Sequence, residues 1–187
     1  MEPKEITIKK AKLSKNDYVE TTYIDEEGNE ITLKGNKKAH PDMRIALEAL
    51  IPFFADLTEQ KEADAIDWEE LQSQHNLELL KRIKVTGVSI GGDDSNRFVT
   101  ITGNRTLMTT RVLNLNSPGV EMDSDTFEWP HIDKFDMALE GFLYEVKEYI
   151  QNHKCDTAQG EFNFDANPDD PFAEADAPAD VAPINVA

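Results

Sequence analysis

Two copies of a His-x-Asp triplet, His40-x-Asp42 and His131-x-Asp133, are the residues whose types and spacing most invite a chemical interpretation. Imidazole and carboxylate groups bind divalent metals, so two triplets brought together by an internal repeat would share one metal ion. However, no third ligand motif and no Glu-x-x-His accompanies them. An Asp at the start of a helix more simply caps the free backbone N–H groups of the first turn. The sequence therefore favours helix caps at Asp42 and Asp133, and we expect no metal and no cofactor.

The other candidate catalytic groups are weaker still. Asp93 and Asp94 would suit Mg²⁺, but they follow two glycines and have the composition of a solvated hairpin loop. The glycine pair is not followed by Gly-Lys-Ser/Thr, so it does not form a phosphate-binding P-loop. The single cysteine, Cys155, has His153 nearby but lacks a fixed base in a shaped pocket. The sequence therefore predicts a protein that is not an enzyme.

Lysines accompany tyrosines on the strands predicted near the N-terminus. A basic, aromatic sheet face is how sequence-tolerant proteins follow the backbone of a single-stranded nucleic acid and stack its bases. The alternative is that the lysines protect and solvate an edge strand. The candidate nucleic-acid-binding residues are Lys9, Lys10, Lys12, Lys34, Lys37, Lys38, Tyr18 and Tyr23.

The sequence predicts two sets of strands, and the candidate nucleic-acid-binding residues lie on or next to the first set. β-Branched and aromatic segments predict strands over 6–13, 18–24 and 30–34, and again over 83–90, 97–102 and 105–115. Lys10 and Lys12 fall on the side of Ile6 and Ile8, which indicates an edge strand or a bend after Ile8. Residues 35–38 and the pair Gly103-Asn104 are expected to form a loop and a hairpin turn, and 116–129 an irregular loop.

An amphipathic helix follows each set of strands. The first begins near Asp42 and is expected to end or kink at Pro52, and the second runs from about Asp133 to Ile150. Both carry Ala-Leu-Glu a few residues after the His-x-Asp triplet. A capping box at Asp67 and Glu70 predicts a connecting helix over 66–80.

This order of elements predicts an α+β fold. We expect antiparallel sheet structure with helices on one side, built from pseudo-duplicated βββα units joined by a linking helix. The predicted folded domain is 1–154, with halves 1–58 and 81–154. Residues 155–187 contain eight acidic and no basic residues and show no apolar periodicity, so they are predicted to be a disordered acidic tail.

The charge balance bounds the function. The net charge is -18, although residues 1–40 are balanced and carry eight of the lysines. No apolar run approaches the roughly 20 residues that a membrane helix needs, and no apolar secretory signal is visible. One cysteine permits no internal disulfide and fits a reducing compartment. We therefore expect a cytoplasmic protein of a bacterium or a phage-infected cell, with no membrane partner.

The tail contains two short motifs that suggest a protein partner. The segment 159–164, Gln-Gly-Glu-Phe-Asn-Phe, resembles the bacterial sliding-clamp-binding peptide, with Phe162 in place of the usual Leu. The resemblance implies that Gln159 binds at the mouth of a groove on the clamp and that Phe162 and Phe164 fill its pockets. Asp-Asp-Pro-Phe, ending at Phe172, resembles the acidic tip of bacterial single-stranded-DNA-binding proteins. Isolated aromatics in a polar tail commonly dock into a partner's groove.

These observations predict a non-enzymatic accessory protein of DNA replication or recombination, encoded by a phage or mobile element. Its sheet would bind single-stranded DNA and its tail would recruit a sliding clamp or another replication protein. Two alternatives remain open. An acidic inhibitor that mimics DNA charge fits the net charge, and a metal-dependent enzyme would use the His-x-Asp or Asp-Asp positions.

Overall fold

The computed structural model describes residues 6–92, 97–122 and 128–156. The chain divides into two units, Met1–Asp156 and Thr157–Ala187, and all described residues lie in the first. Its elements in chain order are β1 (Thr7–Leu13), β2 (Tyr18–Ile24), β3 (Glu30–Lys38), α1 (Pro41–Glu48), α2 (Ile51–Leu57), the 3₁₀ turn η1 (Ala63–Ala65), α3 (Gln74–Leu80), β4 (Ile83–Gly91), β5 (Phe98–Thr106), β6 (Val112–Asn116), β7 (Val120–Glu121) and α4 (Ile132–Asn152).

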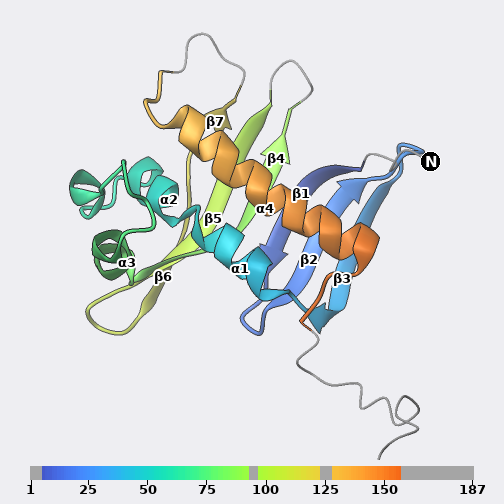
Figure 1. Cartoon of the computed structure of the whole chain (residues 1–187), viewed down its shortest axis with the longest axis horizontal. Coiled ribbons are helices and arrows are strands. Elements are labelled where there is room, and N and C mark those ends of the chain that lie inside the picture. The colour runs from blue at the N-terminus through green and yellow to red at the C-terminus, as the bar shows by residue number, and fades with distance from the viewer. Residues whose placement is uncertain (1–5, 93–96, 123–127, 157–187) are drawn as a thin grey trace, which may run out of the picture. The chain divides into compact units, whose positions relative to one another are not determined.

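The described strands form one antiparallel sheet in the order β3-β2-β1-β4-β5-β6, with β7 also pairing with β5. α4 crosses the sheet diagonally and lies beside α1 on the same face (Figure 1). The predicted α+β class, with helices on one side of an antiparallel sheet, is confirmed. Among the described residues, no helix combines the length and apolarity that a bilayer crossing requires.

The two halves of the sheet repeat each other. Each half contains three antiparallel strands followed by a helix, with the two-residue strand β7 as an addition in the second half, and the first strands of the halves, β1 and β4, pair antiparallel at the centre. Both first strands carry a β-bulge, between Ile8 and Lys10 in β1 and between Val85 and Gly87 in β4. An antiparallel central pair with matching bulges is what a two-fold repeat produces, so the pseudo-duplicated arrangement is present.

The bulge in β1 explains its unusual side-chain pattern. It shifts the alternation by one residue, so that Ile8 and Ala11 are both buried while Lys10 is exposed and Lys12 is half-exposed. The bend expected after Ile8 is therefore confirmed. The alternative of an edge strand is wrong, because β1 pairs with β2 on one side and β4 on the other.

The core lies between the helix layer and the sheet. Phe53 and Phe54 of α2 and Phe135 and Phe142 of α4 are fully buried there, together with Ile101 of β5. Complete burial of an apolar side chain of this size contributes roughly 1.5–3 kcal/mol. These residues hold α2 and α4 on one face of the sheet, and none of the helices described packs on the opposite face.

The caps of the two main helices differ from the prediction. His40, not Asp42, is the N-cap of α1, because its imidazole Nδ1 accepts a hydrogen bond from the Asp42 N–H at 3.2 Å. His131, not Asp133, is the N-cap residue of α4, without a side-chain cap bond. The expected break at Pro52 is confirmed, since α1 ends at Glu48 and Pro52 lies in the first turn of α2.

The predicted linking helix over 66–80 is only half formed. α3 begins at Gln74, with Ser73 as its cap, and the Asp67 carboxylate accepts bonds from the N–H groups of Glu69 and Glu70 in a local turn. The competing feature is Asn76, which is 1% exposed. Its amide bonds the backbone N–H and C=O of Asp67 and two further carbonyls of the turn. Because the Asn76 side chain already makes hydrogen bonds with these backbone groups, they do not need the backbone hydrogen bonds of a helix.

Three predicted loops are partly strand. Residues 35–38 continue β3, and the segment 116–129 contains β7. Gly103 and Asn104 lie inside β5, opposite Val85 and Lys84. A Cβ at Gly103 would lie 2.7 Å from the Phe54 ring, so this glycine serves the close approach of α2 and not a turn. Cys155 pairs with Ala39 after β3, so ordered structure continues into the start of the predicted tail.

Candidate nucleic-acid interface

The face of the sheet opposite the helices, called here the open face, is polar. Its residues alternate with buried ones along β1, β2, β4 and β5, and none of the described helices packs on it. Lysines and hydroxyl residues predominate among them. The open face includes Lys10, Lys12, Glu20, Thr22, Thr32, Lys34, Ser89, Thr100 and Thr102.

Three of the predicted lysines converge on a single carboxylate, Glu20 of β2, on the β1–β3 half of this face. Lys12 and Lys34 lie on either side of Glu20 in the strand register, and Lys12 Nζ is 3.0 Å from Glu20 Oε1. The hydrogen bond from Lys12 holds the pKa of Glu20 below its ordinary value, and the charges of Lys12, Lys34 and Lys10 act in the same direction. The cluster therefore carries a net positive charge within a strongly acidic protein.

Two cross-strand rows extend the cluster over the sheet. One row runs from Lys34 through Glu20 and Lys12 to Gly87 and Thr102. The neighbouring row consists of Thr32, Thr22, Lys10, Ser89 and Thr100, and the hydroxyls of Thr22 and Thr32 lie 3.1 Å apart. Ammonium and hydroxyl groups both bind phosphate oxygens, so the rows can follow a sugar–phosphate backbone.

The structure separates the two predicted tyrosines. Tyr18 alternates with buried Val19 and therefore lies on the open face. Tyr23 packs against the core on the helix-covered side, so it does not join the lysines. An aromatic residue that we did not predict, Phe98, is 42% exposed on the open face, and Gly91 leaves room for its ring.

The internal repeat of the sequence could have identified Phe98 as a candidate residue. Tyr18 precedes buried Val19 at the start of β2, and Phe98 precedes buried Val99 at the start of β5. The two aromatics therefore occupy equivalent positions in the repeat, one on each half of the open face. Aromatic rings on a basic sheet face provide platforms on which unpaired bases stack.

The remaining predicted lysines lie at the margins. Lys9 sits at the β1 bulge and is half-buried. Lys37 and Lys38 lie at the end of β3, where Lys37 C=O accepts a bond from the Tyr149 hydroxyl at 3.1 Å and Lys38 is opposite Tyr18. These three residues therefore extend the lysine cluster less directly than Lys10, Lys12 and Lys34 do.

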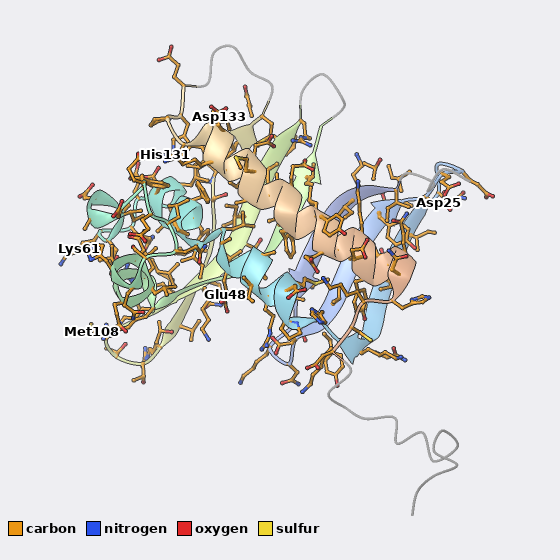
Figure 2. The ribbon with its side chains drawn as sticks, viewed as in Figure 1. Asp25, Glu48, Lys61, Met108, His131 and Asp133 are labelled. Carbon is orange, nitrogen blue, oxygen red and sulfur yellow. The ribbon has the colours of Figure 1, made fainter. Side chains whose placement is uncertain are left out.

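The two His-x-Asp triplets are far apart. His131 and Asp133 lie at the start of α4 (Figure 2). The His131 ring stacks on Trp68 with centroids 3.5 Å apart. Asp42 is bound by Lys154, just beyond the other end of α4, at 2.8 Å. A helix of 21 residues separates these points by about 30 Å. The triplets therefore cannot share a metal ion, and no three His, Cys, Asp or Glu side chains converge within the described ranges.

His131 lies in a partly buried, aromatic environment. Desolvation holds the pKa of His131 below its ordinary value, because the ring is covered by Trp68 and its neighbours. The ring thus packs as a neutral aromatic group in a cluster with Phe53, Trp129 and Phe135.

Several predicted residues lie outside the described ranges. These are Asp93, Asp94 and the tail residues Gln159, Phe162, Phe164 and Phe172. Their proposed roles stay predictions from the sequence.

Comparison of the whole chain with protein-family models, curated proteins and solved structures finds no match.

Proposed function

We propose that this chain is a non-enzymatic accessory protein of DNA replication or recombination whose open face binds single-stranded DNA. The observation that supports this most strongly is the convergence of Lys10, Lys12 and Lys34 around Glu20 on a sheet face free of helices. In a protein that is acidic overall, a cationic patch attracts a polyanion to that part of the surface.

The neighbouring groups fit the same ligand. Rows of threonine and serine hydroxyls continue the lysine cluster across the sheet, and Tyr18 and Phe98 add aromatic surface on each half. Phosphate contacts and base stacking together give sequence-tolerant binding. On this proposal the acidic tail recruits a replication protein, such as a sliding clamp, through Gln159, Phe162, Phe164 and Phe172.

Replacement of the three central lysines tests the proposal. We expect the triple variant Lys10→Ala, Lys12→Ala, Lys34→Ala to bind a labelled 20-nucleotide oligothymidylate more weakly in fluorescence polarization. The slope of log K against log salt should become shallower by about 2, because about 0.7 counterions are released per contact with a single strand.

A second triple variant controls for net charge. Lys61→Ala, Lys81→Ala and Lys147→Ala remove the same charge from loop and helix positions and should leave the slope unchanged. Equal losses in the two triple variants, or no binding by the parent protein at about 50 mM salt, would refute the proposal. Capture of a DNA-binding protein without any binding of DNA would favour the DNA-mimic alternative.

A further inference from the structure

β1 and β4 separate after a short pairing and leave a groove between them. They pair only at Lys10–Lys12 opposite Gly87–Ser89. Beyond Lys12, β1 turns into its hairpin, where the Ser14 N–H donates to Tyr18 C=O at 2.9 Å. In the described part of the chain, residues 83–86 of β4 therefore have no strand partner on the β1 side. The groove has a volume of about 740 Å³.

The groove is apolar on its helix side. Leu47 and Ile51 of the α1–α2 region and Leu80 of α3 line it. Three of its residues are unusually exposed for their type, with Ile45 at 62%, Val112 at 58% and Leu77 at 55%. Exposed apolar side chains grouped around a cavity commonly mark an interaction site.

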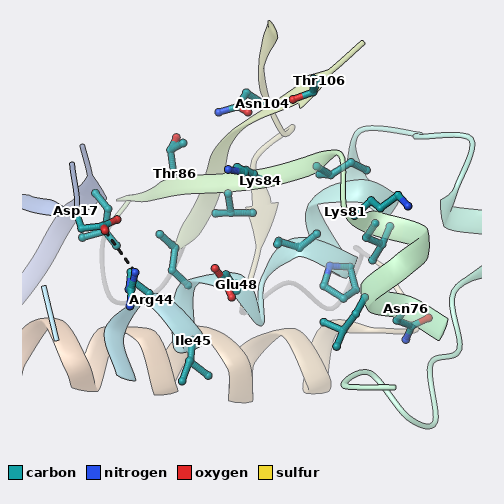
Figure 3. A pocket seen from close by; sticks show the side chains of 18 of the residues that line it. Asp17, Arg44, Ile45, Glu48, Asn76, Lys81, Lys84, Thr86, Asn104 and Thr106 are labelled. Carbon is teal, nitrogen blue, oxygen red and sulfur yellow. Dashed lines mark hydrogen bonds and ion pairs between the residues drawn. The ribbon is translucent and has the colours of Figure 1, made fainter. Parts of the chain in front are cut away.

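The charged residues of the groove are mostly cationic. Lys15, Arg44, Lys81 and Lys84 line it, against Asp17 and Glu48. Arg44 binds Asp17 at 3.5 Å (Figure 3). Lys15 and Lys84 form no ion pair with any residue that the structure describes. Unpaired lysines in a chain of net charge -18 indicate an anionic occupant.

We infer that this groove binds an extended, acidic segment of a partner protein, which adds to the free edge of β4 at residues 83–86. An added strand presents alternate side chains to opposite faces. In Figure 3, Ile45 and Glu48 lie on the α1 side of β4, while Lys84 and Thr86 point to the other side. The matching segment therefore alternates apolar residues, facing Ile45 and Leu47, with acidic residues, facing Lys84.

This inference is separate from the proposed DNA binding. The groove surrounds the end of β4 and includes Lys84 on its far side, whereas the lysine cluster lies on β1, β2 and β3. Each can fail without the other.

A simple peptide serves as the probe. A fluorescein-labelled ten-residue peptide of alternating valine and glutamate should bind the full-length protein saturably in fluorescence polarization. The same peptide with lysine in place of glutamate should bind at least about tenfold more weakly. Hydrogen exchange should show new protection at those amides of residues 83–86 that point away from β5.

Matched variants locate the site. Ile45→Glu, inside the groove, should weaken binding of the valine–glutamate peptide by about tenfold or more. Met137→Glu places the same charge on α4 at a residue that is 77% exposed and outside the groove, and it should have no effect. Ile45→Glu should also leave oligothymidylate binding unchanged.

Three results would overturn the inference. The first is the absence of saturable binding up to about 1 mM peptide. The second is equal weakening by Ile45→Glu and Met137→Glu. The third is self-association of the parent protein in sedimentation that Ile45→Glu abolishes, since the groove would then hold a second copy of this chain.

Discussion

At the residue scale, a few side chains with several partners fix the irregular parts of the chain. Asn76 organises the turn before α3, and Arg105 does the same for the segment after α2. Arg105 Nη1 and Nη2 each lie 2.6 Å from a Glu62 oxygen, and Nη1 also donates to Gln60 Oε1 at 2.8 Å. Both side chains of this ion pair are about one-fifth exposed. A bidentate, mostly buried pair of this kind tethers the loop to β5.

The Glu62–Arg105 pair predicts a pH dependence of stability. The hydrogen bond from Arg105 lowers the pKa of Glu62 below its ordinary value of 4.5. The pair therefore stabilises the fold fully above that ordinary value, and the contribution is lost as the pH falls through the lower pKa of the folded state. At pH 7, Glu62→Gln should reduce the free energy of unfolding by about 1–3 kcal/mol.

Urea unfolding of both proteins between pH 7 and pH 3 measures this contribution. The difference in unfolding free energy should stay constant down to about pH 5 and then shrink as Glu62 takes up a proton. A difference that grows as the pH falls contradicts the assignment.

At the element scale, glycines allow helices and strands to approach closely. A Cβ at Gly103 would lie 2.5 Å from Lys84 C=O and 2.7 Å from the Phe54 ring. Gly141 of α4 has no neighbour within 4 Å of such a Cβ. Both glycines lie within regular elements, but a side chain is sterically excluded at Gly103 and has free space at Gly141.

Alanine at each position should separate these roles. We expect Gly103→Ala to destabilise the protein by about 1–3 kcal/mol, because β5 and α2 must move apart. Gly141→Ala should stabilise it by up to about 1 kcal/mol, because alanine is the better helix former. Thermal unfolding of the two variants measures both effects, and a neutral Gly103→Ala would show that α2 does not pack closely on β5.

The elements that the sequence predicted well are those with a strong repeating pattern. β2 and α4 follow directly from their β-branched and amphipathic patterns. The errors arise where one distant contact overrides a local signal. The hydrogen bond from Asp67 N–H to Asn76 holds the predicted capping box in a turn. Gly103, predicted to lie in a hairpin turn, lies instead within β5, where the Phe54 ring packs against it. Neither contact is visible in a window of ten residues.

At the scale of the whole described domain, duplication and charge separation act together. Two βββα halves join their first strands at the centre of the sheet, which places both helices on one face and leaves the other face polar. The sequence predicted the lysines of this face but not its aromatic partners, because the side on which Tyr23 lies depends on strand pairing. Phe98 could have been found from the repeat, since it matches Tyr18.

The most direct test of the account is to map the contact surface of single-stranded DNA on the full-length protein by amide NMR. Addition of oligothymidylate should shift the resonances of the open-face rows, including Lys10, Lys12, Lys34 and Thr100. Resonances of α1 and α4 should stay in place, because these helices cover the opposite face of the sheet. Shifts concentrated on α1 and α4, or none on the open face at saturating DNA, would contradict the central claim.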